Sequence, residues 1–150
     1  MKLQGSIEID TPPEKVWPFL IEPENILEWN FPLEEFEFTS KHSGVGATFY
    51  YVEEMPRGTM KLHFEITEWV ENERIVFHMT TGEFLKDDEQ SWILERTPSG
   101  CRFIFLENAV FPYGIIGRFL GMFARIGSQS NVKKMLAKLK NLAEKSCISK

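Results

Sequence analysis

A contrast between the last quarter of this chain and the rest most constrains its fold. Residues 112–145 have the spacing of one long helix, whereas most of the sequence before them alternates apolar and polar residues as strands do. A sheet must bury its apolar face, and the long helix is the only large element available to cover it. We therefore predict an α+β fold, a single domain of residues 1–150 in which a curved antiparallel sheet wraps around the C-terminal helix.

Proline, glycine and asparagine divide the first part of the chain into short elements. Residues 2–10 form the first strand candidate, and Pro12, Pro13 and Pro23 delimit two short helical stretches after it. Further strands are expected at 33–40, 47–54, 59–70, 74–81, 90–97 and 101–111. Short turns join most of them, so neighbouring strands should pair antiparallel in a sheet of about seven strands.

The hairpin at residues 59–81 predicts which side chains face inward. If Val70 pairs with Ile75, then His63 and His78 lie on the outer face of the sheet. The inner face then carries the apolar residues Leu62, Phe64, Ile66, Val70, Ile75, Phe77 and Met79. This division is typical of an antiparallel sheet with one buried face.

Glu68 and Trp69 interrupt that alternation. One explanation is a β-bulge that exchanges their faces, which would place Glu68 at the surface. The other is a buried Glu68, whose burial would raise its pKa and suit it to act as a base.

The stripe of the long helix that faces the sheet changes character halfway along. Its C-terminal half presents the apolar residues Val132, Met135, Leu136, Leu139 and Ala143. The same stripe nearer the N-terminus presents Gly114, Gly117, Gly121, Ala124, Arg125 and Ser128. Because each glycine within a helix costs about 1 kcal/mol relative to alanine, the functional explanation is a ligand cavity of roughly 300 Å³ or more. The alternatives are a helix broken near Gly127 or a close approach to a strand.

Large apolar residues fall on the opposite face of that half of the helix. They are Ile115, Ile116, Phe119, Leu120 and Phe123. Such a face indicates either a lid over the cavity or an interface. A homodimer or another protein interaction through residues 115–123 is therefore an alternative function.

Composition excludes several classes of protein. A hydrophobic content of 43% excludes disorder, and a net charge of −5 argues against nucleic-acid binding. The most apolar stretch, 109–126, contains Arg118 and Arg125, so no membrane span is expected. Cys101 and Cys147 cannot build a disulfide framework. With no signal peptide at the N-terminus, these features predict a cytoplasmic protein.

Five segments resemble the START-like proteins, relatives of the Bet v 1 allergens, most closely the polyketide cyclase/dehydrase and lipid-transport branch. They are IDTPPEKVWPFL at 9–20, VGA at 45–47, ITEWV at 66–70, RIVF at 74–77 and LAKLKNLAE at 136–144. The resemblance implies a helix-grip fold, with two short helices after the first strand. Its members include binders of lipids and hydrophobic small molecules as well as aromatase/cyclases, so it does not choose among these functions.

No motif for a metal, a cofactor or a catalytic nucleophile is present, and we expect none of these groups. The leading hypothesis is binding or transport of a hydrophobic small molecule, and the enzyme alternative is a cyclase or dehydratase. Polar candidates near the cavity are Tyr50 or Tyr51, Glu53, Glu68, Glu107, Asn108, Arg125 and Ser128. Among them, Arg125 would suit a carboxylate or phosphate group. The predicted ligand-binding residues are Tyr51, Leu62, Phe64, Ile66, Phe77, Trp92, Gly117, Gly121, Ala124, Arg125 and Ser128.

Overall fold

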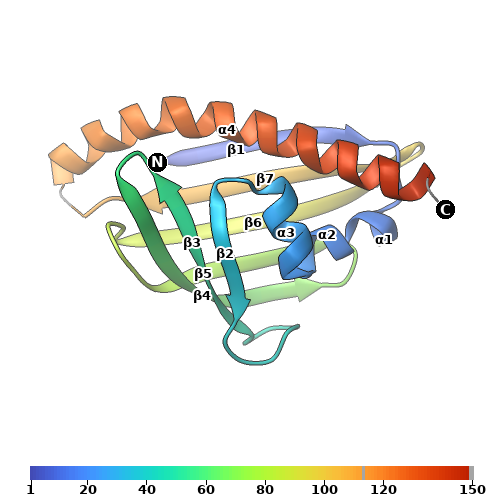
Figure 1. Ribbon diagram of the computed structural model, residues 1–150, viewed down its shortest axis with the longest axis horizontal. Coiled ribbons are helices and arrows are strands. Elements are labelled where there is room, and N and C mark those ends of the chain that lie inside the picture. The colour runs from blue at the N-terminus through green and yellow to red at the C-terminus, as the bar shows by residue number, and fades with distance from the viewer. Residues whose placement is uncertain (113, 149–150) are drawn as a thin grey trace.

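Seven antiparallel strands form one curved sheet (Figure 1). They are β1 (Lys2–Ile9), β2 (Leu33–Phe38), β3 (Thr48–Met55), β4 (Gly58–Val70), β5 (Arg74–Gly82), β6 (Asp87–Thr97) and β7 (Gly100–Val110). Their spatial order is β1-β7-β6-β5-β4-β3-β2. The computed structural model describes the backbone of residues 1–112 and 114–148, and their side chains except those of 115, 118–127, 147 and 148.

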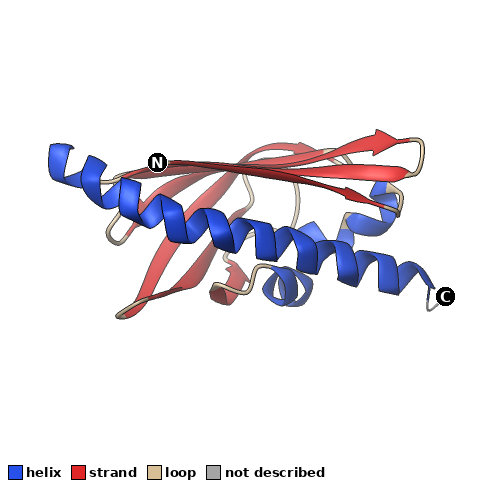
Figure 2. Ribbon diagram, turned by 90° about the horizontal axis from the view of Figure 1, so that it is seen from above, coloured by secondary structure: helices blue, strands red, loops and turns tan. Residues whose placement is uncertain are grey.

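A long helix, α4 (Gly114–Ile148), covers the concave face of the sheet. It lies along β1 and also contacts β7 and α3 (Pro23–Trp29), and Figure 2 shows helix and sheet as two layers. The backbone stays helical past Gly127, so the expected break there is absent from the described helix. This arrangement confirms the helix-grip fold. No helix of the described residues is both long and apolar enough to span a membrane.

Three short helices, rather than the two expected, follow β1. They are α1 (Pro13–Val16), α2 (Pro18–Ile21) and α3, and each begins with a proline at its first position. Because proline has no backbone N–H to continue the preceding turn, Pro18 ends α1 and starts α2. The Trp29 indole Nε1 then donates a 2.7 Å hydrogen bond to the Phe19 carbonyl oxygen, which fixes α3 against α2.

A β-bulge at Thr67 resolves the conflict at Glu68 and Trp69. Ile66 pairs with Phe77, but Glu68 pairs with Val76, so Thr67 is the extra residue. The expected pairing of Val70 with Ile75 is therefore wrong; Trp69 pairs with Ile75, and Val70 with Arg74.

The bulge decides what each side chain contacts. Trp69 turns toward the core and meets Trp17 edge to face at 5.3 Å between ring centroids. Glu68 turns outward, its side chain 45% exposed, and pairs with Arg74 at 3.1 Å. A buried catalytic Glu68 is thus ruled out by its position.

The two histidines of this hairpin lie on the outer face, as predicted. The His63 ring lies 5.7 Å from that of Tyr50, and His78 Nε2 lies 2.7 Å from Asp87 Oδ1. On the opposite face of α4, Ile116 is exposed. The side chains of Ile115, Phe119, Leu120 and Phe123 lie outside the described residues, so the lid or interface at 115–123 stays a prediction.

Candidate functional site

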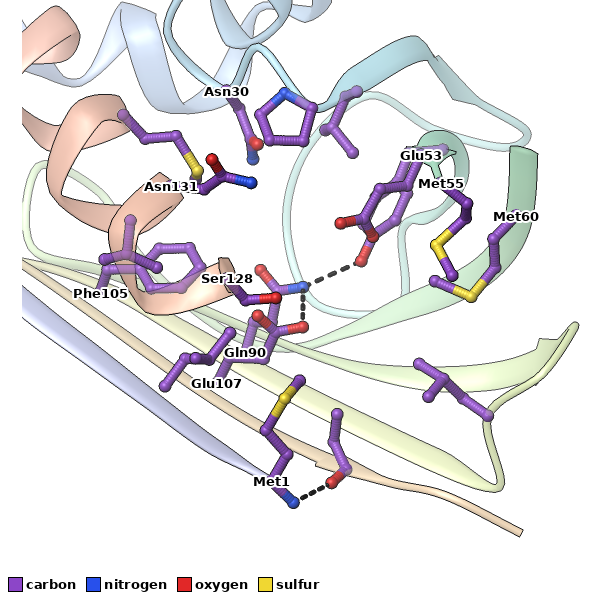
Figure 3. A pocket seen from close by; sticks show the side chains of 18 of the residues that line it. Met1, Asn30, Glu53, Met55, Met60, Gln90, Phe105, Glu107, Ser128 and Asn131 are labelled. Carbon is purple, nitrogen blue, oxygen red and sulfur yellow. Dashed lines mark hydrogen bonds between the residues drawn. The ribbon is translucent and has the colours of Figure 1, made fainter. Parts of the chain in front are cut away.

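A cavity of about 150 Å³ lies between one end of the concave sheet face and the middle of α4 (Figure 3). Its apolar walls include Leu3, Leu33, Met55, Met60, Leu85, Phe105, Ala109, Phe111, Val132 and Met135. Its polar lining consists of Asn30, Tyr51, Glu53, Gln90, Glu107, Ser128 and Asn131. The cavity therefore has mainly apolar walls with several polar groups among them, which is the general pattern of small-molecule sites.

Strand alternation places the polar residues together. Tyr51 and Glu53 stand two apart on β3, and Asp88 and Gln90 two apart on β6, so each pair shares the inner face. Glu107 on β7 is the register partner of Gln90. The curl of the sheet brings β3 across the cavity to face β6 and β7.

Gln90 is the centre of the hydrogen-bond network. Its Nε2 lies 3.0 Å from Tyr51 Oη, 3.3 Å from Asp88 Oδ2 and 3.3 Å from Glu107 Oε1, while its Oε1 accepts from Trp92 Nε1 at 3.3 Å. An amide NH₂ has only two hydrogens, so the three oxygens compete for them. Asp88 is fully buried, and it also shares a side-chain hydrogen bond with the Glu107 carboxyl.

Burial makes these carboxyls weak acids, because it outweighs the opposite effects of His78 on Asp88 and of the N-terminal amine on Glu107. Desolvation, strengthened by the charge of Asp88, raises the pKa of Glu53 from 4.5 to about 7. Desolvation also raises the pKa of Asp88 from 3.8 to about 6, against a lowering by the Gln90 hydrogen bond. Desolvation and the charges of Asp88 and Glu53 hold the pKa of Glu107 well above its usual range. Burial raises the pKa of Tyr51 too, so its phenol stays neutral.

The structure brings only part of the predicted site to this cavity. Tyr51 and Ser128 line it. Five other predicted residues are buried in the core and do not line it: Leu62, Phe64, Ile66, Phe77 and Trp92. Gly117 is buried against Phe111, where an added Cβ would lie 3.2 Å from the Phe111 Cβ. For Gly121, Ala124 and Arg125 only the helical backbone is described.

The cavity is about half the size expected from the small-residue stripe of the helix. Cavities that bind drug-sized ligands span about 300–1,000 Å³, whereas one of about 150 Å³ in another protein binds benzene. The available volume thus suits one aromatic ring, or the end of a longer molecule that extends through the mouth.

Two central residues, Asp88 and Gln90, were absent from the predicted site. The expected strand began at Gln90, which left Asp88 in a loop, whereas β6 begins at Asp87. Strand alternation could have indicated them. Asp88 and Gln90 lie on the same face of the strand as Trp92, and they are polar at positions where an apolar residue is expected. Within the described residues, no group of three or more His, Cys, Asp or Glu side chains is arranged to hold a metal ion.

A curved antiparallel sheet closed by one long helix defines the helix-grip class of proteins. This chain belongs to the polyketide cyclase/dehydrase and lipid transport family, whose model matches residues 1–144. Among curated proteins, none matches the sequence significantly.

Solved structures share the fold at low sequence identity. The protein TTHA0849 of Thermus thermophilus is 19% identical, with a TM-score of 0.82 over 97% of this chain and 99% of that one. The Zhui aromatase/cyclase of Streptomyces sp. R1128 is 12% identical, with a TM-score of 0.77 over 96% of this chain and 93% of that one. The di-domain aromatase/cyclase StfQ of the steffimycin pathway is 13% identical, with a TM-score of 0.78 over 97% of this chain and 51% of StfQ.

Proposed function

We propose that this protein binds a small, mainly apolar molecule in the cavity between the sheet and α4. The observation that carries the proposal is the combination of apolar walls with a polar cluster, in which Gln90 joins Tyr51 and two carboxyls. An apolar body is held by contact with Phe105 and Met135, while a polar group on the ligand reaches the Gln90 network. Membership of a lipid-transport and cyclase family supports this function.

The volume narrows the ligand class. A ligand held entirely within about 150 Å³ has the size of a single substituted ring. A fused polyketide or a long lipid would have only one end inside. The proposal therefore concerns a monocyclic aromatic compound or the end of a longer apolar chain.

A filling substitution tests the site. Ser128 lines the cavity from α4, whereas Ser130, two residues along, is exposed. We expect benzyl alcohol to shift the NMR resonances of the lining residues, including the Gln90 side-chain amide, in the wild type. Ser128→Phe should abolish these shifts, and the matched control Ser130→Phe should retain them. Equal binding by both variants would contradict the proposed site.

The raised pKa values of the carboxyls favour one second candidate, an acid–base enzyme of the dehydratase type. Glu53 lines the cavity, and its pKa of about 7 lets it exchange a proton near neutral pH. In such a reaction the base removes a proton next to a carbonyl, and an acid protonates the departing hydroxyl, which leaves as water.

A turnover assay separates binding from catalysis. The probe is the 3-hydroxy-3-phenylpropanoyl thioester of N-acetylcysteamine, whose dehydration gives the conjugated cinnamoyl thioester with strong ultraviolet absorbance. If the protein is a dehydratase, the absorbance should grow with the wild type and should not grow with Glu53→Gln. The Glu53→Gln variant should still bind benzyl alcohol. Binding without absorbance growth would favour the binding function alone.

A further inference from the structure

One exposed phenylalanine, Phe84, marks the mouth of the cavity. It is 67% exposed, whereas the other described residues that line the cavity are buried or half-buried. It belongs to the loop between β5 and β6, and its neighbour Leu85 also lines the cavity. The cavity wall therefore ends in a phenyl ring that faces solvent.

The two strands that this loop joins separate at the cavity end of the sheet. The last pair between β5 and β6 is His78 with Glu89. Beyond it, β5 stays paired with β4 as far as Gly82, and β6 pairs with β7 from Asp87 onward. Among the described residues, no pairing joins β5 to β6 in this part of the sheet. The loop thus crosses between two separated strands, and in Figure 1 it lies at the end of the sheet where α4 begins.

A strained turn holds Phe84 at the mouth. Its φ is 60°, and the N–H of the next residue donates to the Glu83 carbonyl oxygen at 2.8 Å. This is a γ-turn of the rare form with positive φ. A bulky residue is an outlier in that conformation, which persists only where the surrounding contacts enforce it.

Such contacts anchor the loop on both sides of Phe84. The Glu83 N–H donates to the Lys61 carbonyl oxygen at 3.2 Å, and the Lys86 N–H donates to the Val110 carbonyl oxygen at 2.7 Å. The loop is therefore fixed to β4 at one end and to β7 at the other. Its geometry keeps the ring of Phe84 in solvent beside the cavity.

We propose that Phe84 is a ligand-binding residue, which packs against the part of a ligand that projects from the cavity. The space of about 150 Å³ inside holds a single ring. Contact with a second ring outside buries the exposed apolar surface of Phe84 and adds an aromatic pair. The ligand is thus an elongated molecule with two apolar groups in line. This inference rests on the proposed function and selects the longer of its two ligand classes.

Two alcohols that differ by one ring test the inference. Calorimetric titration compares benzyl alcohol with 4-benzylbenzyl alcohol, whose second ring hangs on a flexible methylene. The wild type should bind the two-ring alcohol at least about tenfold more tightly, because its second ring buries apolar area against Phe84. Phe84→Ala should reduce this preference about fivefold. Phe84→Tyr should keep the preference, because it retains the ring.

The matched control is Phe31→Ala, which truncates another exposed phenylalanine. Phe31 is 39% exposed and does not line the cavity, so its truncation should leave the preference intact. Circular dichroism and the resonance shifts caused by benzyl alcohol verify that each variant is folded with an intact cavity.

The outcomes distinguish the inference from the proposed function. Equal binding of the two alcohols by the wild type overturns the inference and leaves the proposed function standing. The same holds for a preference that Phe84→Ala keeps, or that Phe84→Ala and Phe31→Ala lose equally. Failure of both alcohols to bind contradicts the proposed function itself.

Discussion

Gln90 Nε2 donates a 3.0 Å hydrogen bond to Tyr51 Oη, although the two residues stand on strands that are not neighbours in the sheet. Gln90 belongs to β6 and Tyr51 to β3, with β5 and β4 between them. Such a contact requires a strongly curled sheet. The bond therefore joins the two sides of the curl at the end where the cavity lies.

Tyr51→Phe should reduce the free energy of unfolding by about 1 kcal/mol, because it deletes one partner of a buried hydrogen bond. The neighbouring Tyr50 provides the control, since its hydroxyl donates to Glu37 at 2.8 Å on the exposed face. Tyr50→Phe should change stability by less than about 0.5 kcal/mol. Urea denaturation measures both values. Equal losses in the two variants would contradict a structural role for the Gln90–Tyr51 bond.

Stability should fall as the pH rises from 5 to 8. The pKa values of Glu53 and Asp88 are raised to about 7 and about 6 in the folded protein, which therefore holds these protons more tightly than the unfolded chain. The stabilisation from these bound protons is complete below the pKa values of the two groups in the unfolded chain. It is lost as the pH rises through their folded-state pKa values of about 6 and about 7. We expect a decrease on the order of 1–3 kcal/mol.

Asp88→Asn should flatten this dependence, because the amide does not ionise. Thermal unfolding across the same pH range provides the measurement. A stability that is constant or increases between pH 5 and 8, or a slope unchanged in Asp88→Asn, would show that the carboxyl cluster is not buried as described.

Truncating the two residues after the bulge should have very different effects. Trp69→Ala removes the edge-to-face contact with Trp17 and should cost about 3 kcal/mol. Glu68→Ala removes only an exposed pair with Arg74 and should cost less than about 1 kcal/mol. Chemical denaturation gives both values, and the reverse order of effects would place the bulge elsewhere.

The outer-face histidines should be nearly neutral when replaced. His63→Gln should change the free energy of unfolding by less than about 0.5 kcal/mol. His78→Gln also breaks the exposed contact with Asp87 and should cost no more than about 1 kcal/mol. Neither change should alter the binding of benzyl alcohol. A loss of binding in either variant would mean that the side chain reaches the cavity.

The fold could be predicted from the sequence because its signals are local. Alternation defined the strands, and prolines defined the starts of the short helices. Even the bulge was marked by the conflict between Glu68 and Trp69. The number of short helices was missed because one helical stretch was predicted before Pro23, whereas Pro18 divides it into α1 and α2.

The site was harder to predict because it depends on long-range geometry. Alternation identified an inner face, but Phe64, Phe77 and Trp92 on that face fill the core, while Tyr51 reaches the cavity. Which inner positions border empty space depends on the curl of the sheet and on the side chains of α4. Gln90 has no motif, and its role comes from partners on β3 and β7.

The most direct test of a ligand cavity between sheet and helix is a crystal structure of the protein soaked in 4-bromobenzyl alcohol. We expect an anomalous bromine peak in the cavity beside Phe105 and Met135, with the hydroxyl oxygen within hydrogen-bond distance of the Gln90–Tyr51 pair. Bromine found only on the outer surface, with the cavity beside Phe105 and Met135 closed, would contradict the proposed site.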